Sequence, residues 1–239
     1  MRKKRSFEAA MTSPKEEGIL LVDKEKTRTA FYLIKVLRKI TGIKKIGHAG
    51  TLDPFATGVM VMLIGRPYTK IADRFLQDDK EYIATLRLGV ATDTYDCDGQ
   101  ITNQSSIIPS IDAIENTIQE FQGSIEQIPP MFSAKKIEGQ KLYVLARKGI
   151  EIPRAPIKIQ VHIEILDYTY PELQLKVSCS KGTYVRSLAH DIGIKLKCYA
   201  HLIALQRTRS GSFELKDCID AKSLSTSSFS YIPYLRKQV

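Results

Sequence analysis

One carboxylate, Asp53, stands in a glycine-rich stretch from Lys45 to Gly58, directly before an apolar run at residues 59–64. The proline that follows it biases Asp53 toward an extended backbone, and the glycines allow close approaches that side chains would forbid. Such a loop can present a carboxylate to a bulky ligand, where it acts as a nucleophile or as a base. An Asp-Pro pair by itself is more often a turn entering a buried strand, so the motif alone leaves both interpretations open.

The stretch at residues 47–58, Gly-His-Ala-Gly-Thr-Leu-Asp-Pro-Phe-Ala-Thr-Gly, resembles the signature of the bacterial tRNA pseudouridine-55 synthase family, the TruB type. Blocks that look like the family's later motifs follow in the same order, at residues 80–82, 89–94, 129–134 and 181–187. The resemblance covers about residues 18–213. It implies the pseudouridine-synthase fold, an α+β architecture with a mixed, mostly antiparallel sheet flanked by helices and loops.

The resemblance also implies roles for particular side chains. Asp53 would be the catalytic residue and Arg186 its partner, since a guanidinium holds a carboxylate ionised and oriented without competing as a base. The other residues implied to bind the substrate are His48, which would stack on exposed bases, and the three that would surround the target uracil, Tyr82, Tyr184 and Leu205. Without the family, the histidine would be a capping or solvent residue, the tyrosines core residues and the leucine a buried residue. The arginine would be a surface or phosphate-contact residue.

Pseudouridine formation breaks the bond between uracil N1 and ribose C1′, turns the base and rejoins it through C5. Asp53 would act as a nucleophile on the sugar or as a base at C2′, and both mechanisms stay open. The rearrangement involves no net oxidation or hydrolysis, so we expect no metal and no other cofactor. The four cysteines are widely spaced without a Cys-x-x-Cys pair, which disfavours zinc and disulfides and favours a reduced, cytoplasmic setting.

The chain carries 36 Lys and Arg against 26 Asp and Glu, a formal net charge of +10 that favours a polyanionic partner. The resemblance implies that this partner is the T stem-loop of tRNA, whose stacked target base must be flipped out. We expect a monomer without an obligatory protein partner. The basic residues expected to position the phosphate backbone are Lys44, Lys45, Lys135, Lys136, Arg147 and Lys148.

Periodic apolar residues predict the elements that carry these motifs. Helices are expected at residues 29–41 and 111–122, with Phe31 and Ile111 among their core contacts. A further helix is expected to start just beyond Arg186. Alternating or continuous apolar residues predict strands at 59–64, 82–88, 159–165 and 173–179.

The domain plan is one catalytic domain at residues 18–222, preceded by a flexible basic arm at 1–17 and followed by a serine-rich tail at 223–239. Many family members carry a C-terminal PUA domain, and none is expected here. Residues 124–158 form a basic insertion, which is a surface loop or, as the family suggests, an RNA-gripping element. No apolar run approaches the roughly 20 residues of a membrane span, which excludes a transmembrane role.

One segment departs from the family pattern. Residues 23–30, Asp-Lys-Glu-Lys-Thr-Arg-Thr-Ala, stand where the family usually has Asp-Lys-Pro-x-Gly-x-Thr-Ser. The missing proline, glycine and serine affect the expected loop geometry and helix entry.

Three other functions compete with this interpretation. A noncatalytic tRNA-binding or tRNA-folding protein would use the same surface to open and reanneal the T arm. A nucleoside or RNA glycosidase is disfavoured, because such enzymes use a second carboxylate and none is evident. A guide-RNA synthase of the archaeal type is also disfavoured, since it would be longer and carry a PUA domain.

Overall fold

The computed structural model describes residues 16–137, 139–226 and 229–237, and one mixed sheet organises most of them. Its strands are β1 (Gly18–Lys24), β2 (Ile46–Ala49), β3 (Thr57–Ile64), β4 (Lys80–Leu88), β7 (Gly123–Gln127), β10 (Ile157–Thr169), β11 (Glu172–Cys179), β12 (Ala200–Ser210), β13 (Phe213–Glu214) and β14 (Ile219–Asp220). Two small sheets pair β5 (Val90–Thr92) with β6 (Ile101–Gln104) and β8 (Lys136–Ile137) with β9 (Gln140–Lys141).

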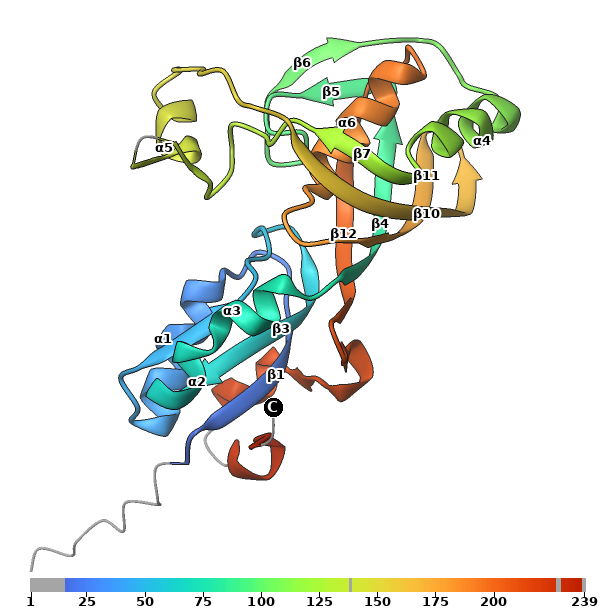
Figure 1. The fold of residues 1–239 in the computed structure, drawn as a ribbon. Coiled ribbons are helices and arrows are strands. Elements are labelled where there is room, and N and C mark those ends of the chain that lie inside the picture. Colours follow the sequence, from blue (N-terminus) through green and yellow to red (C-terminus); the bar gives the residue numbers. More distant parts are fainter. Residues whose placement is uncertain (1–15, 138, 227–228, 238–239) are drawn as a thin grey trace, which may run out of the picture.

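The large sheet has the order β14–β1–β3–β12–β4–β11–β10–β7, with β13 beside β12 and β2 beside β3. The β1–β14 and β3–β12 pairings are parallel and the others are antiparallel. The predicted α+β class with a mostly antiparallel sheet is therefore confirmed. β4 and β12 run through the centre and join a lower half, built on β1 and β3, to an upper half built on β10 and β11 (Figure 1).

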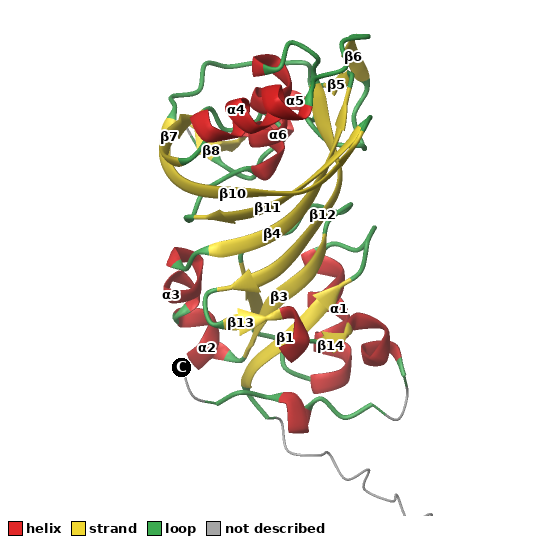
Figure 2. Ribbon diagram, turned by 90° about the vertical axis from the view of Figure 1, so that its right-hand side faces the viewer, coloured by secondary structure: helices red, strands yellow, loops and turns green. Residues whose placement is uncertain are grey.

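Helices cover both halves of the sheet (Figure 2). The lower half carries the first three and the upper half the next three. They are α1 (Ala30–Thr41), α2 (Arg66–Lys70), α3 (Ala72–Gln77), α4 (Ile111–Glu120), α5 (Leu142–Ala146) and α6 (Val185–Lys195), and short 3₁₀ turns follow as η1 (Leu215–Asp217), η2 (Ala221–Ser225) and η3 (Ile232–Tyr234). In the described part of the chain, no helix is long and apolar enough to cross a membrane.

The apolar run on β3 is buried on both faces. Met60 and Met62 belong to the core that includes Leu33 and Leu37 of α1, whereas Val61 and its alternating neighbours pack with Phe75 of α3. A strand covered by helices on both sides has no polar face, which explains why residues 59–64 are continuously apolar. The strand predicted there is confirmed.

Helix α1 agrees with the predicted bounds to within one residue, and most of its predicted apolar stripe packs on the core. The Thr29 side chain accepts a hydrogen bond from the Tyr32 amide at 3.1 Å, and Gly42 ends the helix with φ 65°. The expected core contact at Phe31 is wrong, because its side chain is 62% exposed. The predicted core residue Leu37 is buried, and Leu33, one turn before it and not in the predicted stripe, is buried beside it.

Two further helix predictions need adjustment. Ser110 caps α4 as predicted, and Ile114 is buried, but Ile111 is 43% exposed and does not belong to the core. Helix α6 starts at Val185 rather than beyond Arg186. Arg186 therefore lies in the first turn of a helix, where its backbone is fixed.

Gly58 allows β3 and β12 to approach each other. A Cβ atom at this position would lie 2.3 Å from the Arg207 carbonyl oxygen, and its φ of +101° is one that side chains rarely adopt. The short parallel pairing places Gly58 opposite Arg207. This contact sets the loop carrying Asp53 directly over the β4–β12 pair.

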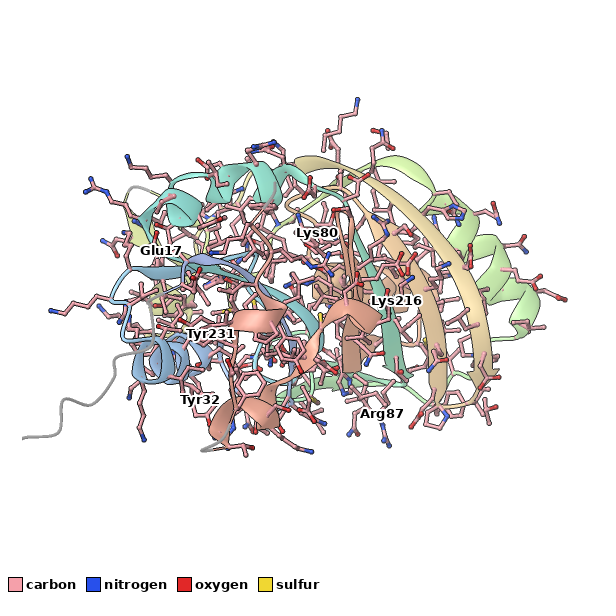
Figure 3. All side chains as sticks on the ribbon, turned by 90° about the horizontal axis from the view of Figure 1, so that it is seen from below. Glu17, Tyr32, Lys80, Arg87, Lys216 and Tyr231 are labelled. Atoms are coloured by element: carbon pink, nitrogen blue, oxygen red, sulfur yellow. The ribbon has the colours of Figure 1, made fainter. Side chains whose placement is uncertain are left out.

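The described residues after 222 pack against the lower half instead of projecting from it. Leu224 and Tyr231 are buried, and Figure 3 labels Tyr231. Ile19 and Arg236 exchange two backbone hydrogen bonds of 2.9 Å. Residues 1–15, which hold most of the expected basic arm, lie outside the described residues. The segment 124–158 contains β7, the β8–β9 hairpin, α5 and the first residues of β10.

Residues 23–30, which differ from the family pattern, still form the loop and the start of helix α1. The cap of α1 is Thr29, so the absent serine at position 30 removes no capping group. Thr27 occupies the family's glycine position with φ 70°, and its amide donates to the Pro54 carbonyl at 2.7 Å. A β-branched residue in this left-handed region is strained.

Replacing Thr27 by glycine is expected to stabilise the protein by about 1 kcal/mol, because relief of the strain exceeds glycine's added backbone entropy. The melting temperature should rise by roughly 2–4 °C in thermal unfolding followed by circular dichroism. Lys26→Gly is the matched control, since position 26 has no positive φ, and it should leave the melting temperature unchanged or lower it. A lower melting temperature for Thr27→Gly would contradict the strain.

Candidate active site

A pocket of about 850 Å³ lies where the lower and upper halves meet, and segments far apart in the sequence line it. The loop before β3, the strands β4 and β12, the loop after β5 and the start of α6 all contribute. Five of the six predicted site residues meet there: Asp53, Tyr82, Tyr184, Arg186 and Leu205.

Backbone contacts clamp the loop that carries Asp53. The Asp53 carbonyl accepts from the Ala56 amide at 3.1 Å, which closes a turn around Pro54. The Pro54 carbonyl accepts from the Thr27 amide and, at 3.3 Å, from Nζ of the fully buried Lys24. The loop is therefore attached to the segment between β1 and α1, which holds Asp53 in place.

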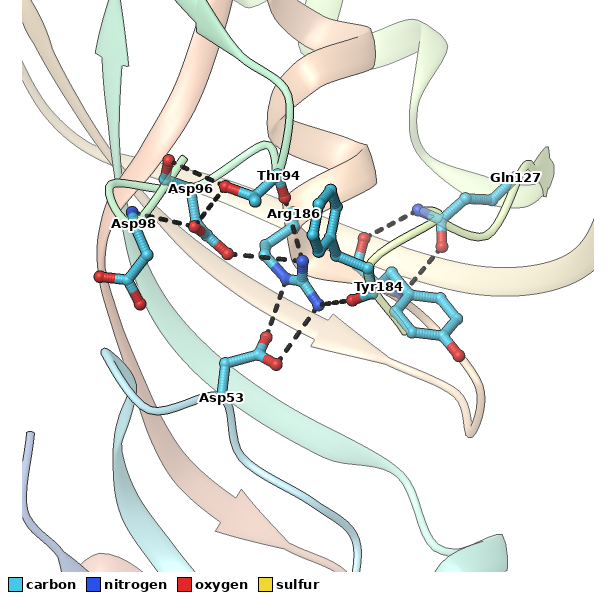
Figure 4. Close-up of polar contacts among 8 residues, drawn as sticks. Asp53, Thr94, Asp96, Asp98, Gln127, Tyr184 and Arg186 are labelled. Carbon is cyan, nitrogen blue, oxygen red and sulfur yellow. Dashed lines mark hydrogen bonds and ion pairs between the residues drawn. The ribbon is translucent and has the colours of Figure 1, made fainter. Parts of the chain in front are cut away.

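Arg186 grips Asp53 with two nitrogens (Figure 4). Its Nε lies 2.8 Å from Asp53 Oδ2, and its Nη2 donates to Oδ1 at 3.3 Å. The remaining donors reach the Thr94 carbonyl at 3.0 Å, the Phe132 carbonyl at 2.8 Å and Asp96 Oδ2 at 3.4 Å. Together these hydrogen bonds and ion pairs involve all three guanidinium nitrogens. Arg186 is 4% exposed and has no freedom to turn away.

Asp96 is a second carboxylate at this site that sequence reasoning missed. It is 5% exposed and accepts hydrogen bonds from the Thr94 hydroxyl at 2.6 Å and the Asp98 amide at 3.0 Å. These bonds and its contact with Arg186 occupy its oxygens, so it supports the arginine and does not face the pocket as a free group. The feature of the sequence that could have identified Asp96 is its position, two residues beyond the family-like block at residues 89–94.

The pocket floor is formed by two paired strands, and Tyr184 stands at its wall. Tyr82 on β4 lies opposite Arg207 on β12, and Leu205 lies opposite Ala84. The Gln127 side chain holds the Tyr184 backbone by accepting from its amide at 2.8 Å and donating to its carbonyl at 3.0 Å. Gln127 was not predicted, because its role depends on the meeting of β7 with the start of α6. Flat aromatic and aliphatic surfaces thus face a carboxylate across the pocket.

Comparisons with known proteins agree with this geometry. The model for the N-terminal domain of TruB family pseudouridylate synthases matches residues 38–185, and the tRNA pseudouridylate synthase B C-terminal domain matches residues 186–238. The chain belongs to the TruB family. A TruB relative from Protochlamydia amoebophila, named tRNA pseudouridine synthase B, is 59% identical over 88% of this chain and 80% of its own length. The Chlamydia pneumoniae protein of the same name is 56% identical over 92% of this chain and 94% of its own length.

Two solved structures share the TruB fold of this chain. A Cbf5–Nop10–Gar1 complex matches with 30% identity and a TM-score of 0.68. An H/ACA ribonucleoprotein bound to a substrate RNA containing 2′-deoxyuridine matches with 26% identity and a TM-score of 0.65. They cover 86% and 92% of this chain. The chain spans about half the length of these two proteins, 53% and 56%.

His48 is the predicted site residue that is not among those lining the pocket. It lies on β2 opposite Met62 of β3, and its buried Nδ1 has no hydrogen-bond partner among the described residues. Burial, followed by the nearby Arg207 charge, lowers the pKa of His48, so the imidazole is neutral near pH 7. A neutral, half-buried ring is suited to stacking, and its contact with RNA stays a prediction.

The basic segment 124–158 contributes one wall of the pocket. Phe132, Tyr143 and Arg147 line it, and the Arg147 guanidinium lies 5.4 Å from the centre of the Tyr143 ring. The lysines predicted to contact phosphates lie at or near the surface: Lys44, Lys45, Lys136 and Lys148 are exposed and Lys135 is half-buried. Within the described residues, no group of three or more His, Cys, Asp or Glu side chains is arranged to hold a metal ion.

Burial at the pocket sets the protonation of Asp53. Desolvation raises the pKa of Asp53 above its ordinary value of 3.8, and the Arg186 charge opposes this rise. The negative charge of Asp96 acts in the same direction as desolvation. The carboxylate is the reactive form whether Asp53 is a nucleophile or a base, so activity depends on its ionisation.

The single-turnover rate of uridine isomerisation is therefore expected to fall on acidification, with a midpoint above 3.8. In an Asp96→Asn variant the midpoint should move to lower pH, because one charge that raises the pKa of Asp53 is gone. The maximal rate should also fall, because Arg186 loses one of its anchors. Circular dichroism at each pH excludes unfolding, and an unchanged or higher midpoint in the variant would contradict the electrostatic account.

Proposed function

We propose that this protein isomerises uridine to pseudouridine at position 55 in the T arm of tRNA, by base flipping and an Asp53-dependent glycosidic rearrangement. One observation supports the proposal: the Asp53 carboxylate at the pocket is held by a buried arginine, opposite a floor and wall that fit a flat base. Membership of the TruB family and relatives named tRNA pseudouridine synthase B support it.

The chemistry needs one carboxylate near the sugar. Asp53 attacks C1′ or removes the C2′ proton while the N1–C1′ bond breaks, and both routes end with a C5–C1′ bond and loss of the C5 proton. Arg186 serves either route by aiming the carboxylate and favouring its ionised form. Tyr82 offers a ring for the flipped uracil, and burial raises the pKa of its hydroxyl, which is therefore protonated near pH 7.

Tyr184 and Leu205 would close the uracil pocket on its other sides, and His48 would stack on bases exposed when the target leaves the helix. Basic side chains around the pocket would position the phosphate backbone without reading sequence. We further propose a cytoplasmic monomer without an obligatory protein partner. The free thiols at all four cysteines are compatible with a reducing compartment.

The glycosidase alternative loses support from the placement of Asp96. A hydrolase would need a second carboxylate free to activate water, and the oxygens of Asp96 are held by Arg186, Thr94 and the Asp98 amide. The Asp98 carboxylate also lines the pocket, so the Asp98→Asn variant below tests it. The noncatalytic tRNA-folding alternative would use the same surface without Asp53. The substitution below separates it from the isomerase.

Asp53→Asn is expected to abolish tritium release from a T-arm stem-loop labelled at uracil C5, with a loss of at least about 10³-fold. Stem-loop affinity should stay within a few fold, because the amide has nearly the same shape. The matched control is Asp98→Asn, which changes a carboxylate lining the same pocket without touching Arg186. If wild type binds the stem-loop but releases no tritium, the isomerase is excluded for this substrate and the noncatalytic alternative takes its place.

A Lys135→Ala/Lys136→Ala/Lys148→Ala variant is expected to weaken stem-loop binding and to flatten its salt dependence. Each lost phosphate contact should reduce the slope of log K against log salt by roughly 0.7–0.9. The measurement is a fluorescence-anisotropy titration at several salt concentrations. Lys216→Ala, at an exposed lysine on η1 outside the pocket lining, should leave the slope unchanged (Figure 3). An unchanged slope in the triple variant would contradict the RNA-gripping role of 124–158.

A further inference from the structure

Arg207 is a buried cation at the pocket that the reaction scheme above does not use. Its side chain is among the largest that are fully buried, with the residue 1% exposed, and it lines the pocket floor. On β12 it stands directly opposite Tyr82 of β4. Side chains opposite each other in an antiparallel pair share one face of the sheet, so Arg207 and Tyr82 lie under the same part of the pocket.

Two of the Arg207 nitrogens are committed to the backbone. Nε donates to the Val59 carbonyl at 2.7 Å, and Nη2 donates to the Gly50 carbonyl at 3.2 Å. These two carbonyls bracket the loop that carries Asp53. Nη1 has no backbone partner among the described residues, and it lies 3.3 Å from where a Cβ atom of Gly50 would stand. The Arg207 side chain also contacts the Tyr82 hydroxyl. Burial raises the pKa of Tyr82, and this hydrogen bond opposes the rise.

Arg207 also lacks a countercharge. Four Lys and Arg side chains are buried in the described chain, and Arg186 has carboxylate partners, whereas Lys24 and Lys80 donate to backbone carbonyls. Burial lowers the pKa of Lys24 to about 8 and lowers that of Lys80, so both can relieve their charge by losing a proton. An arginine does not deprotonate. No ion pair joins Arg207 to a carboxylate in residues 16–137, 139–226 and 229–237.

An unpaired buried charge is unfavourable, and it is best explained by an anion that is present during the reaction. We propose that Arg207 stabilises the negative charge on the detached uracil, as a further catalytic residue that donates from Nη1 to a uracil oxygen. The inference rests on the proposed function. A fixed donor and charge aimed at developing negative charge in a water-poor site is an effective form of catalysis.

The charge arises in the first bond-breaking step. When N1–C1′ breaks, the electron pair stays on N1 and spreads to O2 and O4, while C1′ bonds to Asp53 or, if Asp53 takes the C2′ proton, becomes doubly bonded to C2′. C5 then bonds to C1′, and Asp53 is released or returns its proton. The C5 proton passes to a base and N1 takes up a proton, which gives neutral pseudouridine. The Arg207 charge also opposes the effect of burial on the pKa of Tyr82, the group beneath that base.

A purely structural role for Arg207 predicts different kinetics from a charge-stabilising role. Fluorine at C5 makes uracil a more stable anion, so 5-fluorouridine depends less on help from the protein when its N1–C1′ bond breaks. Loss of charge stabilisation should therefore harm uridine more than 5-fluorouridine. Loss of support for the Asp53 loop should harm both equally.

The test uses T-arm stem-loops with uridine or 5-fluorouridine at the target, in single-turnover reactions with saturating protein. Formation of the C1′–C5 bond is measured by nuclease digestion and chromatography, since fluorine leaves no C5 proton to follow. Arg207→Gln is expected to slow uridine rearrangement by about 10²-fold, with a clearly smaller deficit on 5-fluorouridine. The matched control is Lys24→Gln, which removes a contact to the Pro54 carbonyl of the same loop and should give equal deficits.

Equal deficits for Arg207→Gln on the two bases, with the wild type active, would overturn this inference alone. No rearrangement of uridine by the wild type would overturn the proposed function and the inference with it. Thermal unfolding checks that each variant is folded. If Arg207→Gln does not fold, Arg207→Lys takes its place, because lysine keeps the charge but loses the Nη1 donor. A deficit that is larger on uridine than on 5-fluorouridine then supports donation from Nη1, and equal deficits overturn it.

Discussion

The ion pair between Asp53 and Arg186 is the interaction on which the rest of the site depends. It joins the loop before β3 in the lower half to the first turn of α6 in the upper half. Because Arg186 is buried, removing Asp53 or Asp96 leaves a desolvated charge with unused donors, which is strongly unfavourable. The same contact orients the reactive carboxylate and connects the two halves of the molecule across the pocket.

The central strands make this pairing geometrically possible. β4 and β12 extend through both halves, and Gly58 lets β3 come close enough to β12 to pair with it. The carboxylate loop is therefore held from below by strand contacts and from the side by the segment before α1. Rigid strands under a clamped loop give the precision that catalysis by a positioned carboxylate requires.

Local patterns in the sequence predicted the elements well, and the family resemblance supplied the site. The caps at Thr29 and Ser110 and the doubly buried run on β3 follow from short-range chemistry, so they were predictable. The exposure of Phe31 depends on the rotation of α1 against the sheet, which periodicity leaves undetermined when apolar residues surround a helix. Asp96 and Gln127 act through partners about 90 and 57 residues away, and no local pattern marks such contacts.

The backbone pairing of Ile19 with Arg236 has a consequence for biosynthesis. β1 lies between β3 and β14, and residues 231–236 pack beside it, so the first strand is completed by some of the last described residues. While the chain is still emerging from the ribosome, that edge of β1 has no neighbour. The lower half must therefore finish folding after synthesis of residue 236, and contacts of such large sequence separation form slowly. The nascent chain has to keep an apolar strand edge from pairing wrongly until then.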